Sequence, residues 1–71
     1  MANGLKHLRE KRLITQEELA SASGVGVATI SRLETGKVRP SMRTIRSLAK
    51  ALDIDPGILY ETFISGQFRL L

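Results

Sequence analysis

Gly24 separates two short stretches of helical periodicity, and this arrangement leaves few folds open to the chain. Thr15 and Glu18 form a capping box at the start of the first stretch. The Thr15 hydroxyl can accept from the amide of Glu18, while the Glu18 carboxylate can accept from the amide of Thr15. Gly24 can adopt a positive φ and therefore ends that stretch. The second stretch begins near Gly26 and stops at Gly36, so the sequence predicts two short helices joined by a tight turn.

Small and apolar residues around this turn favour close packing of the two helices. Ala20 is small enough to let the helices meet at a steep angle, and Val25 can fill the gap beneath both. Ile30 is then expected to pack back against Leu19. A helix, a tight turn that contains glycine, and a second helix make up the helix-turn-helix motif.

Three further helices are predicted around this pair, which makes an all-α domain of five helices. They cover residues 3–13, a segment that begins at Ser41, and a segment that begins at Asp55. Ser41 is a good N-cap, and Asp55 precedes Pro56, a residue favoured at the first helical position. The apolar residues expected to face the core are Leu5 and Leu8 in the first helix, Met42, Ile45, Leu48, Ala49 and Leu52 in the second, and Ile58, Leu59 and half-buried Tyr60 in the third.

The chain has 71 residues, the size of one domain. We expect that domain to cover residues 1–62, followed by a hydrophobic tail over residues 63–71. No apolar run approaches the length of a membrane span, and the charged residues near the N-terminus do not fit a signal peptide. Cysteine is absent, which excludes disulfides, a thiol nucleophile and a cysteine-based zinc site. A cytoplasmic location is expected.

An excess of basic residues favours an anionic partner. Lysine and arginine number 11 against 7 acidic residues, for a formal charge of +4. Nucleic acid and anionic lipid are the chief candidates, and ordinary solubilising charge is the alternative. Aromatic residues make up 4% of the chain, too few for the stacking platforms of single-strand binders.

Nothing in the sequence predicts an enzyme, a metal site or a cofactor. His7 is the one histidine, and it lies among basic residues without metal-binding partners. Serine and aspartate residues form no nucleophile motif, and no phosphate-cradling glycine loop is present.

An ordered set of residues resembles the lambda-repressor/Cro-type family, also called the xenobiotic-response-element family. The set covers about Leu5 to Leu59, and its spacing carries the resemblance. It comprises Thr15-Gln16-Glu17-Glu18-Leu19-Ala20, Gly24-Val25, Ile30-Ser31, Glu34-x-Gly36, Pro40-Ser41 and Leu48-Ala49-x-x-Leu52. The resemblance implies a five-helix bundle whose third helix enters the major groove of duplex DNA.

The resemblance places Val27, Ala28, Thr29 and Arg32 at base edges, because the N-terminal part of a recognition helix faces the groove floor. Arg32 can make a bidentate contact to guanine, and the three smaller side chains suit a thymine methyl group. Two alternatives stay open: Val27 as a core residue, and Arg32 as a phosphate contact or a solvated charge.

The expected phosphate contacts lie on either side of this helix. Gln16 occupies the position that bonds a phosphate and steadies the recognition helix in the family, and a helix N-terminus adds a favourable dipole. Flexible solvated surface is the alternative for the basic residues. The full set is Thr15, Gln16, Gly26, Ser31, Lys37, Arg39 and Arg43. The resemblance also suggests that Arg9 and Glu34 form a structural ion pair.

Three residues depart from the family pattern. Gly26 stands where serine or threonine often caps the recognition helix, Leu13 stands at a helix end that often holds glycine or a polar residue, and Asp53 stands where glycine is frequent. Glycine is tolerated as an N-cap at a cost of a few tenths of a kcal/mol. Local packing is the one explanation we offer for Leu13.

The C-terminal tail would be an aggregation liability if it were exposed. Its apolar residues, expected to pack on the domain or on a second copy, are Phe63, Ile64, Phe68, Leu70 and Leu71. A homodimer would suit a palindromic operator. The sequence thus favours a sequence-specific regulator of transcription, most simply a repressor. The alternative is an antitoxin or adaptor of the same fold with a toxin or another protein as partner.

Overall fold

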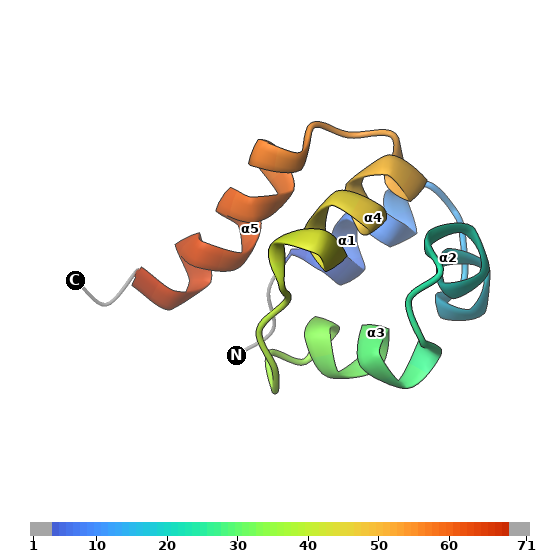
Figure 1. The fold of residues 1–71 in the computed structure, drawn as a ribbon, viewed down its shortest axis with the longest axis horizontal. Helices are drawn as coiled ribbons and strands as arrows, with labels where there is room; N and C mark the ends of the chain where they lie inside the picture. Colours follow the sequence, from blue (N-terminus) through green and yellow to red (C-terminus); the bar gives the residue numbers. More distant parts are fainter. Residues whose placement is uncertain (1–3, 69–71) are drawn as a thin grey trace.

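The fold of the chain, a computed structural model, is made of five α-helices (Figure 1). The structure describes residues 4–68, and the surroundings of side chains for residues 4–64. The helices are α1 (Leu5–Lys11), α2 (Gln16–Ser23), α3 (Val27–Glu34), α4 (Met42–Leu52) and α5 (Pro56–Phe68). Residues 4–68 contain no strand. The predicted all-α fold with a helix-turn-helix is therefore confirmed.

The N-terminal ends of three helices follow the local signals of the sequence. The Thr15 hydroxyl accepts from the Glu18 amide at 3.0 Å, and the Glu18 carboxylate accepts from the Thr15 amide at 2.8 Å. The Ser41 hydroxyl accepts from the Thr44 amide at 3.1 Å. Asp55 accepts from the amide of Gly57 at 2.9 Å, one residue after Pro56 opens α5. Each cap satisfies an amide that has no partner within its helix.

The core lies where α4 packs between α2 and α5, with α3 against α2 and α1 against both α3 and α5. In Figure 1, α3 forms the lower edge of the bundle, and α5 extends away from the other helices toward the C-terminus. The buried apolar side chains come from every helix: Leu5, Leu19, Ile30, Leu33, Ile45, Leu48, Ala49, Leu52, Leu59 and Phe63. The close packing predicted around the turn at Gly24 is present, since Ala20 and Val25 pack against this core.

Two apolar residues expected inside, Met42 and Ile58, are exposed instead, whereas Tyr60 is close to the half-burial that was predicted. Met42 is 76% exposed, Ile58 56% and Tyr60 45%. Met42 shares a helix face with Ile45, but it is the first residue of α4 and lies beside Pro56 and Tyr60 at the rim of a groove. Periodicity identifies the side of a helix that faces the core, and it does not show how far along that side a neighbouring helix extends.

Two predicted boundaries also differ from the structure. The first helix was expected over residues 3–13 but covers Leu5–Lys11, because the chain turns at Arg12 and Leu13. Helix α5 runs without a break across position 62, where the sequence predicted the domain to end. Phe63 lies in the core, so the domain includes at least this residue of the expected tail.

Leu13 and Asp53 adopt left-handed backbone conformations at the ends of α1 and α4, with φ of 58° and 57°. Asp53 donates its amide to carbonyls of the last turn of α4, and its own carbonyl accepts from Arg12 at 3.1 Å. Leu13 is 91% exposed, so the local packing offered to explain it is wrong. A leucine in this conformation strains the backbone, since its Cβ crowds the following carbonyl.

We therefore expect Leu13→Gly to stabilise the protein by about 0.5–1 kcal/mol. Glycine relieves the strain of the left-handed conformation, which stabilises the protein by roughly 1–2 kcal/mol. It also raises the entropy of the unfolded chain, which offsets part of this gain. Urea unfolding followed by circular dichroism measures the change. Leu13→Ala is the matched control, because it removes the same exposed side chain and keeps the Cβ. A glycine variant no more stable than the alanine variant would contradict the strain argument.

Candidate nucleic-acid interface

Helix α3 turns one face into the core and the other outward. Ile30 and Leu33 are buried, while Ala28 and Arg32, four residues apart, are exposed on the opposite side. Val27 is 41% exposed, so the alternative that it is a core residue is wrong. The four side chains predicted to face bases include one, Thr29, that is half-buried. The outward face of α3 thus carries two apolar side chains and one arginine.

The start of α3 leaves its first amides without a side-chain cap. Gly26 has an extended backbone (φ −61°, ψ 143°) and offers no hydroxyl to the helix. A Cβ added at Gly26 would meet only the Thr29 hydroxyl, at 3.8 Å, so the fold does not exclude a larger residue there. Backbone N–H groups and the positive end of the helix dipole make such a terminus favourable for a phosphate oxygen.

The expected phosphate contacts fall into two groups. Five of them are exposed: Thr15, Gly26, Lys37, Arg39 and Arg43. Lys37 and Arg39 lie in the segment between α3 and α4, and Arg43 lies in the first turn of α4. Gln16 and Ser31 are half-buried. The three cations of this set therefore follow α3 in the chain, whereas Arg32 belongs to α3 itself.

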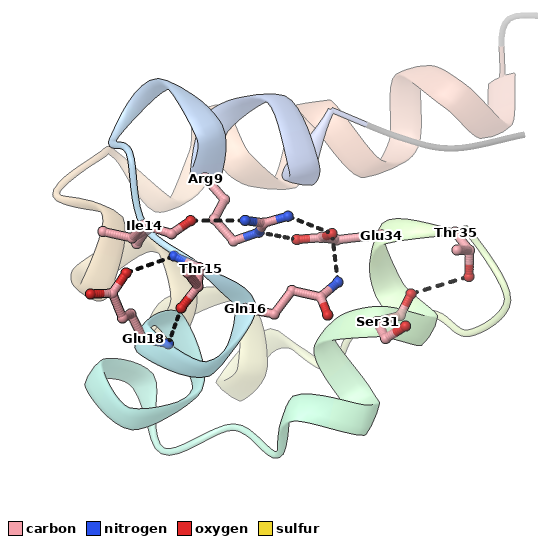
Figure 2. A network of polar contacts seen from close by, with 8 residues as sticks. All are labelled: Arg9, Ile14, Thr15, Gln16, Glu18, Ser31, Glu34 and Thr35. Atoms are coloured by element: carbon pink, nitrogen blue, oxygen red, sulfur yellow. Dashed lines mark hydrogen bonds and ion pairs between the residues drawn. The ribbon is translucent and has the colours of Figure 1, made fainter.

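A buried polar network ties α3 to the rest of the bundle (Figure 2). Arg9 donates from Nε to Glu34 Oε2 at 2.6 Å and from Nη2 to Glu34 Oε1 at 3.2 Å. The Gln16 amide donates to Glu34 Oε1 at 2.9 Å. Arg9 also donates from Nη1 to the carbonyl of Ile14 at 2.8 Å. One carboxylate thus joins α1, α2 and the last residue of α3, and this fixes the orientation of α3.

The network contains two contacts that the sequence did not predict. The resemblance suggested the Arg9–Glu34 pair and gave Gln16 a phosphate to bind, but it gave no sign that Gln16 donates to Glu34. Nothing predicted the contact of Arg9 with the Ile14 carbonyl either. Gln16 and Glu34 are 18 residues apart, and no local pattern links side chains at that separation.

Burial and hydrogen bonding shift the pKa of the Glu34 carboxyl in opposite directions. Burial raises the pKa of its carboxyl, but the hydrogen bonds from Arg9 and Gln16, with the charge of Arg9, outweigh this effect and lower the pKa below its ordinary value. The hydrogen bond to Glu34 raises the pKa of Arg9 despite its burial. Both groups are charged at neutral pH, as a buried pair with well-placed hydrogen bonds requires.

Acid is therefore expected to weaken the fold through Glu34. A carboxyl whose pKa is lower in the folded state contributes stability above its unfolded pKa, about 4.3, and loses it as the pH falls through the lower folded value. At pH values below about 4.3, we expect the urea concentration at the unfolding midpoint to fall more steeply with pH in the wild type than in Glu34→Gln. Unfolding curves between neutral and acidic pH measure this, with the exposed Glu61→Gln as control. Equal pH dependence in all three proteins would contradict it.

The apolar residues near the C-terminus do not share one environment. Phe63 is 7% exposed and packs in the core of this chain, and Ile64 is half-buried. Phe68 is the last residue of α5, but its side chain lies outside the described surroundings. Leu70 and Leu71 lie outside the described residues altogether.

The helix lengths and the acidic and histidine side chains of the described part of the chain bear on two other kinds of site, a membrane span and a metal site. None of the helices there is long and apolar enough to cross a membrane. Over the same residues, no three acidic or histidine side chains gather where they could hold a metal ion.

Comparison with known proteins identifies the fold. A family model described as helix-turn-helix matches residues 5–59. The HTH-type transcriptional repressor RghR of Bacillus subtilis is 48% identical over 59 residues, which are 80% of this chain and 44% of RghR. An HTH-type transcriptional regulator of Methanocaldococcus jannaschii is 38% identical over 63 residues, 86% of this chain and 96% of that protein.

A third relative is the HTH-type transcriptional regulator DdrOP3 of Deinococcus deserti, which is 36% identical over 57 residues. The chain covers 44% of DdrOP3, the same share as of RghR, and so spans less than half the length of these two regulators. Residues 5–59, which the family model matches, include the capping box, the turn at Gly24, the outward face of α3 and the network around Glu34. The chain belongs to the lambda-repressor/Cro-type helix-turn-helix family, a family of transcriptional regulators.

Proposed function

We propose that this chain binds duplex DNA sequence-specifically and represses transcription, with α3 in the major groove. The exposed outward face of α3 carries the proposal. Val27, Ala28 and Arg32 are exposed on this helix, and the helix lies at the edge of the bundle (Figure 1). A helix about 10–12 Å wide fits a groove about 12 Å wide. Only in that groove does each base pair present a distinct pattern of donors, acceptors and methyl groups.

The flanking cations support the same placement. Lys37, Arg39 and Arg43 follow α3 in the chain and are exposed, where they can bind the phosphates on one side of the groove. Thr15 and the backbone amides at the N-termini of α2 and α3 can bind the phosphates on the other side of the groove. Backbone contacts of this kind fix the register of a protein on DNA, and the base contacts supply the specificity. Binding should weaken steeply with salt, because neutralised phosphates release counterions.

A homodimer on a palindromic operator completes the proposal. Half-sites read by two-fold related recognition helices lie about 34–36 Å apart. Residues 4–68 contain one helix of this kind, so a second copy of the chain is needed to read the next half-site. Among the described tail residues, Ile64 is half-buried and able to contribute. We place the protein in the cytoplasm, where its DNA target would be.

Selection from a pool of random duplexes tests the proposed function. We expect an enriched palindrome, bound by two chains as measured by sedimentation of the complex. No enrichment from the pool, together with capture of a specific protein partner, would overturn it in favour of the adaptor or antitoxin alternative.

Arg32→Ala and Arg39→Ala should affect binding in different ways. Loss of a bidentate guanine contact by Arg32 relaxes the preference at one base position, with a cost of about 1–3 kcal/mol. Loss of a phosphate contact by Arg39 weakens all sequences alike and reduces the salt slope by about one. Selection with each variant, followed by titration at several salt concentrations, separates the two. An unchanged consensus for Arg32→Ala would show that Arg32 does not read a base.

A further inference from the structure

An open groove between the N-terminal halves of α4 and α5 contains none of the residues proposed to contact DNA. Its volume is about 460 Å³, within the range of about 300–1,000 Å³ that is usual for small-molecule sites. The two helices pack against each other (Figure 1). The described residues that line the groove are Met42, Ile45, Arg46, Pro56, Gly57 and Tyr60. We propose that this groove binds a small aromatic carboxylate.

Arg46 supplies the charge of the groove. It is exposed, and among the side chains of residues 4–64 none forms an ion pair or a hydrogen bond with it. Asp55 precedes the groove residue Pro56 in the chain, but its carboxylate accepts from the amides of Gly57 at 2.9 Å and Ile58 at 3.3 Å. The planar guanidinium of an arginine fits a carboxylate through two parallel N–H donors. A carboxylate is therefore the group that complements Arg46.

The apolar lining of the groove favours an aromatic ring beside that carboxylate. Ile45 is buried beneath the groove, whereas Met42 is 76% exposed and Tyr60 45% exposed at its rim. A methionine sulfur makes favourable contacts with aromatic rings, and a tyrosine ring pairs with another ring in stacked or edge-to-face geometry. An aliphatic chain would gain neither contact. A ring system that covers Met42 and Tyr60 also removes their apolar surface from water.

Titration of the full 71-residue chain with naphthoate, followed through amide chemical shifts by NMR, tests the proposal. We expect saturable shifts at Arg46, Gly57 and Tyr60, with a dissociation constant on the order of 0.1–1 mM for a ligand of this size. Naphthylmethylamine has the same rings with the opposite charge, and acetate has the carboxylate without rings. Neither should saturate over the same concentrations. Binding of either compound as tight as that of naphthoate would overturn the proposal.

The variant Arg46→Gln links binding to the groove. We expect it to bind naphthoate at least about tenfold more weakly, because hydrogen bonds to a charged group are among the stronger ones. Lys50→Gln is the matched control, since Lys50 is also exposed on α4, does not line the groove and loses the same charge. Its affinity should stay within about twofold of the wild type. Both variants change exposed side chains and should fold, as a thermal melt would verify. Wild-type affinity in Arg46→Gln would place the ligand elsewhere and overturn the proposal.

Failure here is distinguishable from failure of the proposed function. The groove and the outward face of α3 share no residue, so a chain that ignores naphthoate can still enrich an operator, and the reverse also holds. If the shifts at Met42 and Tyr60 follow the protein concentration and naphthoate does not alter them, a second copy of the chain covers the groove. That result would also overturn the proposal.

Discussion

Glu34→Ala is expected to destabilise the domain by about 3–5 kcal/mol, the cost of removing one partner from a buried ion pair. The substitution leaves the buried Arg9 guanidinium with its hydrogen bond to the Ile14 carbonyl but without its carboxylate partner, and the Gln16 amide loses its acceptor. Domains have about 0.05–0.15 kcal/mol of stability per residue, or roughly 4–11 kcal/mol for this chain. The substitution should therefore remove at least about a quarter of the stability of the domain.

Urea unfolding at neutral pH measures this loss, and two further variants interpret it. Glu61 is exposed, so Glu61→Ala should change the free energy of unfolding by less than about 0.5 kcal/mol. The double variant Arg9→Met/Glu34→Leu removes both charges, and we expect it to recover most of the stability, because apolar residues of similar volume often replace buried pairs without loss. A loss below about 1 kcal/mol for Glu34→Ala is the value for an exposed pair and would contradict the burial of this network.

Leu48→Ala is expected to cost about 2–5 kcal/mol, the range for large-to-small changes in a core. Leu48 is fully buried in α4, the helix that packs against both α2 and α5. Truncation removes apolar burial and leaves a cavity that neighbouring helices can fill only in part. The effect on DNA binding should follow the loss of folded protein rather than a change of consensus.

Met42→Ala is the matched control for Leu48→Ala, since both residues belong to the apolar stripe that the sequence predicts for α4. Met42 is 76% exposed, so its truncation should change stability by less than about 0.5 kcal/mol. Thermal and urea unfolding of the two variants compare them directly. Equal losses of stability in the two variants would mean that Met42 is as buried as the helical periodicity predicts, and would contradict the observed packing of α4.

Signals between near neighbours in the chain located the helices. The Thr15–Glu18 capping box, Ser41 and Asp55 act over two or three residues, and Gly24 ends α2 through its own φ of 76°. Such interactions form wherever the local sequence occurs, so they can be identified without knowledge of the fold. The family resemblance then supplied the arrangement of the helices and the residues of the outward face of α3.

The exact ends of the helices and the burial of individual side chains depended on contacts between distant segments of the chain. The sequence alone determined an all-α chain with a helix-turn-helix, because capping and helical periodicity are local. Only the tertiary structure decided that Met42 is exposed and Phe63 buried, and that Gln16 donates to Glu34. Burial depends on where other helices lie, and a hydrogen bond across 18 residues exists only after packing has brought α2 and α3 together.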